Sequence, residues 1–133
     1  MSPLFHESEE KIAQEAAAQA ECDRLVALSP AALAVELMPA YGPQGPHGHG
    51  PNGGINILQV LAWLSDSHFP SSGGSFFSQL QEPVREGIQA LDHAGLIVTT
   101  AGREGSWTSA TRLGLAALEE GTLRQYLTAP AAG

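Results

Sequence analysis

Apolar residues recur at helical spacing in the second half of the chain. Val84, Ile88 and Leu91 are separated by four and three residues, which places them on one face of a helix. Pro83 suits the first turn of such a helix, because its missing N–H has no partner there, and the glycine that follows the helix is a typical stop. The pattern therefore predicts a helix over 83–94.

A β-hairpin and a further helix are predicted next. Residues 96–100 are rich in β-branched side chains, 101–105 form a polar turn with two glycines, and 107–109 can return as a second strand. Thr111 is a plausible N-cap for a helix with apolar positions at Leu113, Ala116, Ala117 and Leu118. Gly121 either interrupts this helix or separates it from a second segment that ends near Tyr126 and Leu127.

The first 38 residues predict two helices. Alanine, glutamate and glutamine dominate 7–28 and favour a helix, but its apolar stripe is thin, so the helix should pack on something. It lies either on its own domain or, swapped, on a dimer partner. Ser29 and Pro30 form an N-cap and a first helical position for a second helix over 31–38, which Pro39 ends.

The middle of the chain is less regular. Glycine and proline alternate through 39–54, which predicts a linker or a long loop. Residues 55–66 are apolar on nearly every side and predict a buried helix, capped by Asn52, although a buried strand would show a similar run. Leu58 and Leu61 should then be buried, each contributing about 2 kcal/mol. A short helix over 75–80 would follow.

The second half resembles winged helix-turn-helix transcriptional regulators of the multiple-antibiotic-resistance and phenolic-acid-repressor kind. The resemblance covers roughly residues 55–120 and rests on two phrases, ALDHAGLIVTT and ATRLGLAAL. The residues that match the family pattern are Leu91, Ala94, Gly95, Leu96 and Ile97, then Thr111, Gly114, Ala117 and Leu118. The resemblance implies a DNA-binding regulator that acts as a homodimer, with 83–94 as recognition helix.

The predicted fold is thus mainly α with a small β-hairpin, a winged helix-turn-helix with an N-terminal helical arm. The predicted divisions are 1–38 for the arm, 39–54 for the linker, 55–128 for the winged domain and 129–133 for a flexible tail. A pocket for a small effector would lie between arm and core.

Four residues are candidates for DNA contact. Arg85 and Gln89 are four apart on the predicted recognition helix, Gln81 precedes it, and Arg103 lies at the tip of the hairpin. Arginine can read guanine or phosphate, and glutamine can read adenine. The alternative interpretation is an ordinary solvated surface.

Charge favours a rival function. The chain has 14 acidic and 6 basic residues, a net charge of −8, whereas phosphate binding usually requires a basic footprint. An acidic winged-helix module that binds protein and not DNA is therefore the second hypothesis.

The remaining chemistry is sparse. Cys22 is the single cysteine, which excludes an intrachain disulfide and favours a reducing cytoplasm. His47 and His49 are weak candidates for half of a metal site, with a flexible loop as the alternative. We expect no cofactor, no enzymatic activity, no secretory signal and no membrane span.

Overall fold

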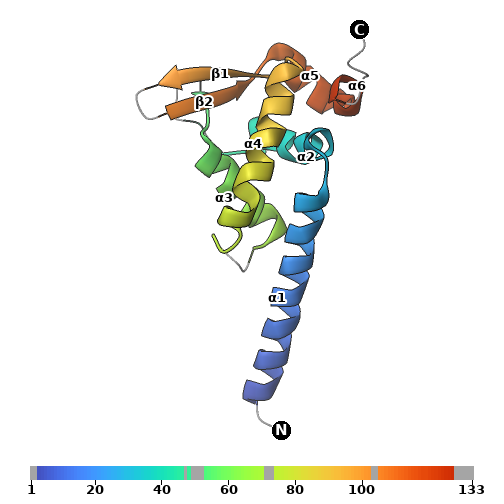
Figure 1. Cartoon of the computed structure of the whole chain (residues 1–133), viewed down its shortest axis with the longest axis vertical. Coiled ribbons are helices and arrows are strands. Elements are labelled where there is room, and N and C mark those ends of the chain that lie inside the picture. Colours follow the sequence, from blue (N-terminus) through green and yellow to red (C-terminus); the bar gives the residue numbers. More distant parts are fainter. Residues whose placement is uncertain (1–2, 47, 49–52, 71–73, 103–104, 128–133) are drawn as a thin grey trace.

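The computed structural model describes residues 3–46, 48, 53–70, 74–102 and 105–127. Figure 1 shows a helical body from which one long helix and one hairpin extend. The elements are α1 (Pro3–Ala27), α2 (Pro30–Leu37), the 3-10 helix η1 (Met38–Tyr41), α3 (Ile57–His68), α4 (Phe77–His93), β1 (Ile97–Gly102), β2 (Gly105–Ala110), α5 (Arg112–Glu120) and α6 (Leu123–Leu127). The predicted fold class, mainly α with a small β-hairpin, is confirmed.

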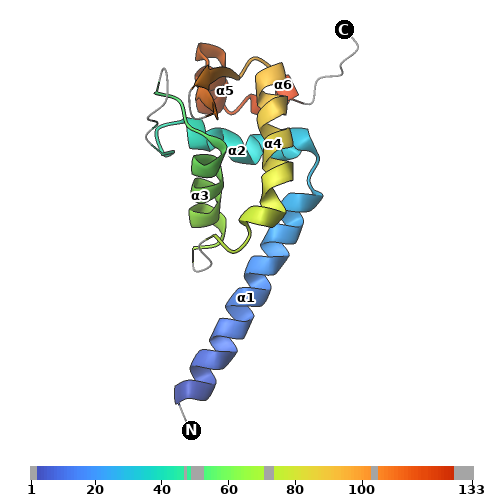
Figure 2. The ribbon, with the colours of Figure 1, turned by 60° about the vertical axis from the view of Figure 1, so that its left-hand side comes forward.

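Helix α1 projects from the body, and only its last turns pack against it (Figures 1 and 2). Cys22 and Leu25 are buried in the core, whereas 9–17 are exposed throughout, including Ile12 at 65%. The predicted helix over 7–28 is confirmed and begins earlier, at Pro3. A swap of this helix onto a partner stays a prediction.

Helix α2 lies inside the core. Ser29 caps it by accepting a hydrogen bond from the Ala32 amide, as predicted, and Leu33 and Leu37 are fully buried against α4. The second helix of the predicted 1–38 arm is therefore part of the body. The chain then continues as η1, so the prediction that 39–54 is irregular was wrong for its first three residues, where Pro39 sits at the start of the 3-10 turn.

Helix α3 begins later than predicted. Asn56 is its N-cap, in a reciprocal capping box with Gln59, whereas the predicted cap Asn52 lies outside the described residues. The preceding residue, Ile55, pairs instead with Thr108 of β2 as an isolated antiparallel bridge. Leu61 is buried as expected, but Leu58 is 60% exposed, because α3 is covered on one side only.

Helix α4 is one continuous helix, so the prediction of separate helices over 75–80 and 83–94 was wrong. Leu80, Val84, Gly87 and Leu91 form its buried face, and this stripe runs unbroken across Pro83. Proline at an interior position removes one helical hydrogen bond, and the packing of α4 against α2, α3 and α1 offsets that loss.

The hairpin is confirmed. β1 and β2 pair antiparallel from Ile97↔Ala110 to Gly102↔Gly105. Thr111 caps α5, as predicted, by accepting from the Gly114 amide, and Gly121 ends α5 in the left-handed conformation, so α6 is a separate segment. No helix in the described ranges combines the length and apolarity that a bilayer crossing requires.

Substitution of Gly114 tests the contact between α5 and the start of the hairpin. A Cβ at this position would lie 1.9 Å from the Leu96 carbonyl oxygen, which is backbone and has little freedom to move. Helix propensity alone would favour alanine by about 1 kcal/mol. Because the clash with the Leu96 carbonyl outweighs this gain, we expect Gly114→Ala to lower the free energy of unfolding by more than about 1 kcal/mol in urea titration. Ala116→Gly, exposed in the same helix, measures the propensity term; a stabilised Gly114→Ala variant would contradict the contact.

Candidate interaction surface

The outward face of α4 is exposed to solvent along the body. Its buried residues recur on one side, which leaves the opposite side in solvent. Gln81, Arg85 and Gln89 are spaced by four and are all exposed, so three of the four predicted DNA contacts share one row of this helix. The fourth, Arg103, lies outside the described residues.

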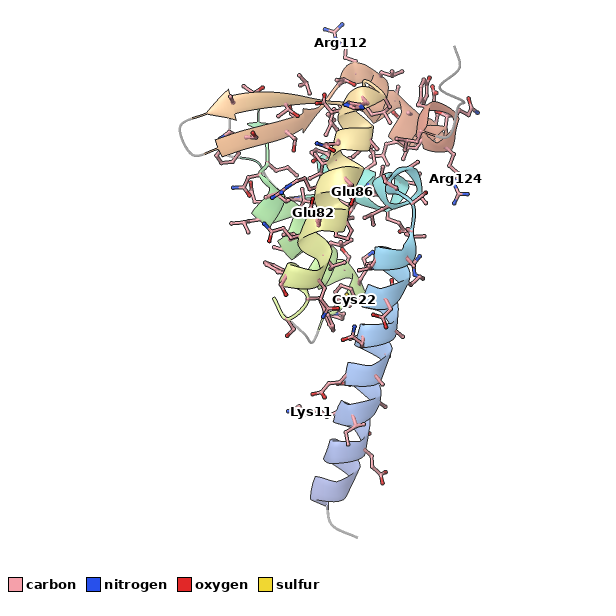
Figure 3. The ribbon with its side chains drawn as sticks, viewed as in Figure 1. Lys11, Cys22, Glu82, Glu86, Arg112 and Arg124 are labelled. Carbon is pink, nitrogen blue, oxygen red and sulfur yellow. The ribbon has the colours of Figure 1, made fainter. Side chains whose placement is uncertain are left out.

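This face is acidic. Glu82 and Glu86 lie on the outer side of α4, as Figure 3 shows, and Asp92 is exposed at its last turn. Arg85 is the basic residue of the row, and its Nη1 lies 3.4 Å from Glu82 Oε2. Both side chains are more than half exposed, so this ion pair contributes little to stability. It nevertheless directs the guanidinium to a carboxylate of the protein itself.

The other described basic residues do not join this face. In Figure 3, Lys11 lies far along α1, Arg112 at the start of α5 and Arg124 on α6, in three separate parts of the molecule. Arg24 is engaged by Glu21 and Glu36. The described residues therefore form no continuous basic patch.

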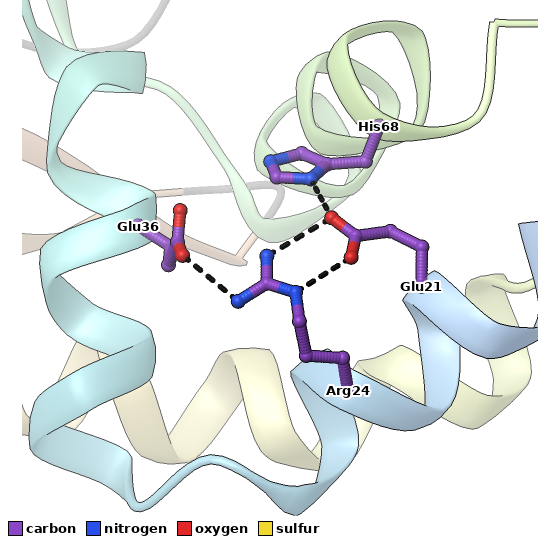
Figure 4. A network of polar contacts seen from close by, with 4 residues as sticks. All are labelled: Glu21, Arg24, Glu36 and His68. Carbon is purple, nitrogen blue, oxygen red and sulfur yellow. Dashed lines mark hydrogen bonds and ion pairs between the residues drawn. The ribbon is translucent and has the colours of Figure 1, made fainter.

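A polar junction of four residues anchors α1 to the body (Figure 4). Arg24 binds Glu21 in a two-point contact, Nε to Oε1 at 2.6 Å and Nη2 to Oε2 at 2.9 Å. Its Nη1 donates to Glu36 of α2 at 3.2 Å, and His68 Nδ1 of α3 lies 2.6 Å from Glu21 Oε2. Arg24 and the Glu21 carboxylate thus connect three helices: Arg24 reaches Glu36 of α2, and Glu21 reaches His68 of α3.

The junction changes the ionisation of Glu21. Hydrogen bonding from Arg24, and then from His68, lowers the pKa of the Glu21 carboxyl to about 2 despite its partial burial. The hydrogen bonds of Arg24 to Glu21 and Glu36 raise the pKa of its guanidinium. The carboxylate is therefore charged at every physiological pH. Sequence spacing could reveal the Glu21–Arg24 pair, but nothing in the sequence indicated that Glu36 and His68 would join it.

The other chemical candidates stay weak. Cys22 is buried beside Gln79. Burial raises the pKa of its thiol, so little of the reactive thiolate is present. His47 and His49 lie outside the described residues. Among the residues that are described, no group of three or more His, Cys, Asp or Glu is placed to hold a metal ion.

Acid should weaken the junction in a defined pH window. Because the pKa of Glu21 is lower in the folded protein than its ordinary value of 4.5, its stabilising contribution is complete above about pH 4.5 and is lost as pH falls through about 2. We expect the difference in free energy of unfolding between wild type and Glu21→Gln to shrink over this window. Glu15→Gln, exposed on α1, is the control. If the difference for Glu21→Gln does not change over this window, ionisation of Glu21 is not coupled to stability.

The comparisons with known proteins give no family for this chain. Family models, curated proteins and solved structures were all compared with it, and none matches. The resemblance to winged-helix regulators stays a prediction.

Proposed function

We propose that this chain is an acidic winged-helix module that binds a protein partner through the outer face of α4. The observation that carries the proposal is the charge of that face: Glu82, Glu86 and Asp92 are exposed on α4, and Arg85 is already paired with Glu82. A DNA-reading helix must approach phosphates, and three carboxylates on its exposed side would repel them. A protein partner carries no array of phosphates, so carboxylates on α4 do not oppose its approach.

The order of elements supports the winged-helix part of the proposal. Helix α2 is followed by the bridge at Ile55, then by α3 and α4, and then by the hairpin. The resemblance implies a recognition helix followed by a hairpin and a further helix, and the helix before the hairpin is the one that contacts a partner. Here that helix is α4, with its outward row in solvent.

The partner's surface should be basic. A net charge of −8 and an acidic contact helix would steer a positively charged protein toward α4 and discourage acidic competitors. The exposed amides of Gln81 and Gln89 would supply hydrogen bonds to a protein partner as readily as to a base. Arg85 and Glu82 could each exchange their mutual contact for one with the partner.

A DNA-binding homodimer is the second candidate function. It is favoured by the row of Gln81, Arg85 and Gln89, which lies where a recognition helix would present its reading residues. The exposed length of α1 would be available for self-association. This candidate requires that Arg85 leave Glu82 and that Arg103, which lies outside the described residues, also contact DNA.

Generic duplex DNA separates the two candidates. The protein-binding proposal predicts no measurable binding by fluorescence anisotropy at ~50 mM salt. The regulator candidate predicts binding that weakens steeply toward ~200 mM salt, and that Arg85→Ala and Arg103→Ala reduce. Tight, salt-dependent binding would overturn the proposal. A random-sequence duplex pool, in place of one duplex, guards against a missed specific site.

Charge reversal on α4 tests the partner surface directly. A photo-crosslinking amino acid at Gln89 should capture the partner, whose purified form is then titrated against wild type and variants. We expect Glu82→Lys/Glu86→Lys to weaken affinity at least about tenfold, about 1.4 kcal/mol, because like charges would face each other. Glu119→Lys/Glu120→Lys is the matched control, since both residues are exposed on α5. Equal loss in both variants would show a nonspecific charge effect and reject the site.

A further inference from the structure

A cavity of about 210 Å³ lies where η1, the Ile55 bridge, β2 and α5 meet. It is distinct from the outer face of α4, and no residue of the 1–38 arm lines it, although an effector pocket was expected between that arm and the core. Its lining combines apolar residues with residues that carry a hydroxyl. The apolar ones include Ala40, Ile55 and Leu115, and the hydroxyl-bearing ones are Tyr41, Thr108 and Ser109.

A chain of hydrogen bonds fixes the polar side of the cavity. Thr108 Oγ1 donates to the Ile55 carbonyl at 3.1 Å, and it lies 2.7 Å from the Tyr41 hydroxyl. A hydroxyl has one proton, so Tyr41 must be the donor to Thr108. The Tyr41 oxygen therefore keeps acceptor capacity, and the Ser109 hydroxyl has no partner among the described residues. The cavity thus offers one fixed acceptor and one adaptable hydroxyl.

The lining carries no charge. None of its residues, all in the described part of the chain, is acidic or basic. Burial raises the pKa of Tyr41 to about 12, only partly offset by its bond to Thr108, so this hydroxyl keeps its proton at physiological pH. An ionised ligand would lose hydration without gaining a countercharge, which disfavours it.

Leu115 at the rim indicates where a ligand would enter the cavity, and Ile55 and Thr108 at the floor are residues that it would contact. Leu115 is 46% exposed, so the cavity reaches the surface at α5. At the floor, Ile55 and Thr108 exchange two backbone hydrogen bonds of 2.8 and 2.7 Å, and they connect the hairpin to the start of α3. A bound molecule would contact both sides of this bridge.

We propose that this cavity is a binding site for a small uncharged organic molecule with an apolar body and an amide-type donor. Its volume is below the roughly 300–1,000 Å³ of drug-sized pockets, so the ligand is a small ring or branched chain with one polar group. The amide N–H donates to Tyr41, the amide oxygen accepts from Ser109, and the body contacts Ile55 and Leu115. The site is independent of what binds α4.

Benzamide and cyclohexanecarboxamide are suitable probes, titrated into the full chain and followed by amide ¹H–¹⁵N spectra. We expect saturable shifts at Ile55, Ser109 and Leu115, and slower hydrogen exchange of the Ile55 and Thr108 amides. Benzoate, of the same shape but charged, should bind at least tenfold more weakly. No saturable shift at these amides with either amide probe overturns the proposal, as does equal binding of benzoate.

Two blocking variants and one control complete the test. Ser109→Leu fills the cavity from β2, and Leu115→Trp closes it from the exposed rim, where a larger side chain is tolerated. Val98→Ala is the matched control, because Val98 is the register partner of Ser109 and does not line the cavity. We expect at least a tenfold loss of affinity in the folded blocking variants and none in the control. Unchanged binding in Leu115→Trp would overturn the site.

Discussion

The packing of α2 against α4 is the contact on which the rest of the structure depends. Gly87 lies at its centre, and even a Cβ there would come within 2.7 Å of Leu37 Cδ1, so the two helices approach as closely as the absence of a side chain permits. Leu33 and Leu37 fill the buried face of α4. Because that face is fully used in the core, the opposite face of α4 is fixed toward solvent, and its acidic character follows from the sequence on that side.

Sequence reasoning succeeded where a signal is local. The caps at Ser29 and Thr111 and the hairpin were predicted from single residues and their neighbours, and all are present. At Gly121 the sequence left two alternatives, and the structure has the separate segment. Pro83 misled the prediction because propensity places proline at a helix start, whereas in α4 burial on both sides of it carries the helix through.

Long-range contacts were beyond the same reasoning. Ile55 could not be recognised as a strand partner of Thr108, because a one-residue bridge has no periodicity. Likewise, Arg85 and Gln89 were correctly placed on one face of a helix, but the addition of Gln81 to that row follows from the continuity of α4, and the separation of the other cations depends on tertiary structure. The polar junction around Glu21 joins residues as far as 47 positions apart, and the cavity is bounded by four elements.

The projecting half of α1 has a hydrodynamic consequence. A helix of 25 residues is about 38 Å long at ~1.5 Å per residue, and the N-terminal part of this one projects from the body (Figure 2). Such an outline raises the frictional ratio, so even a single copy should elute early from a sizing column. Apparent mass from elution volume would then mimic association, and only a method that reads mass without assuming a shape, such as light scattering, can count the chains.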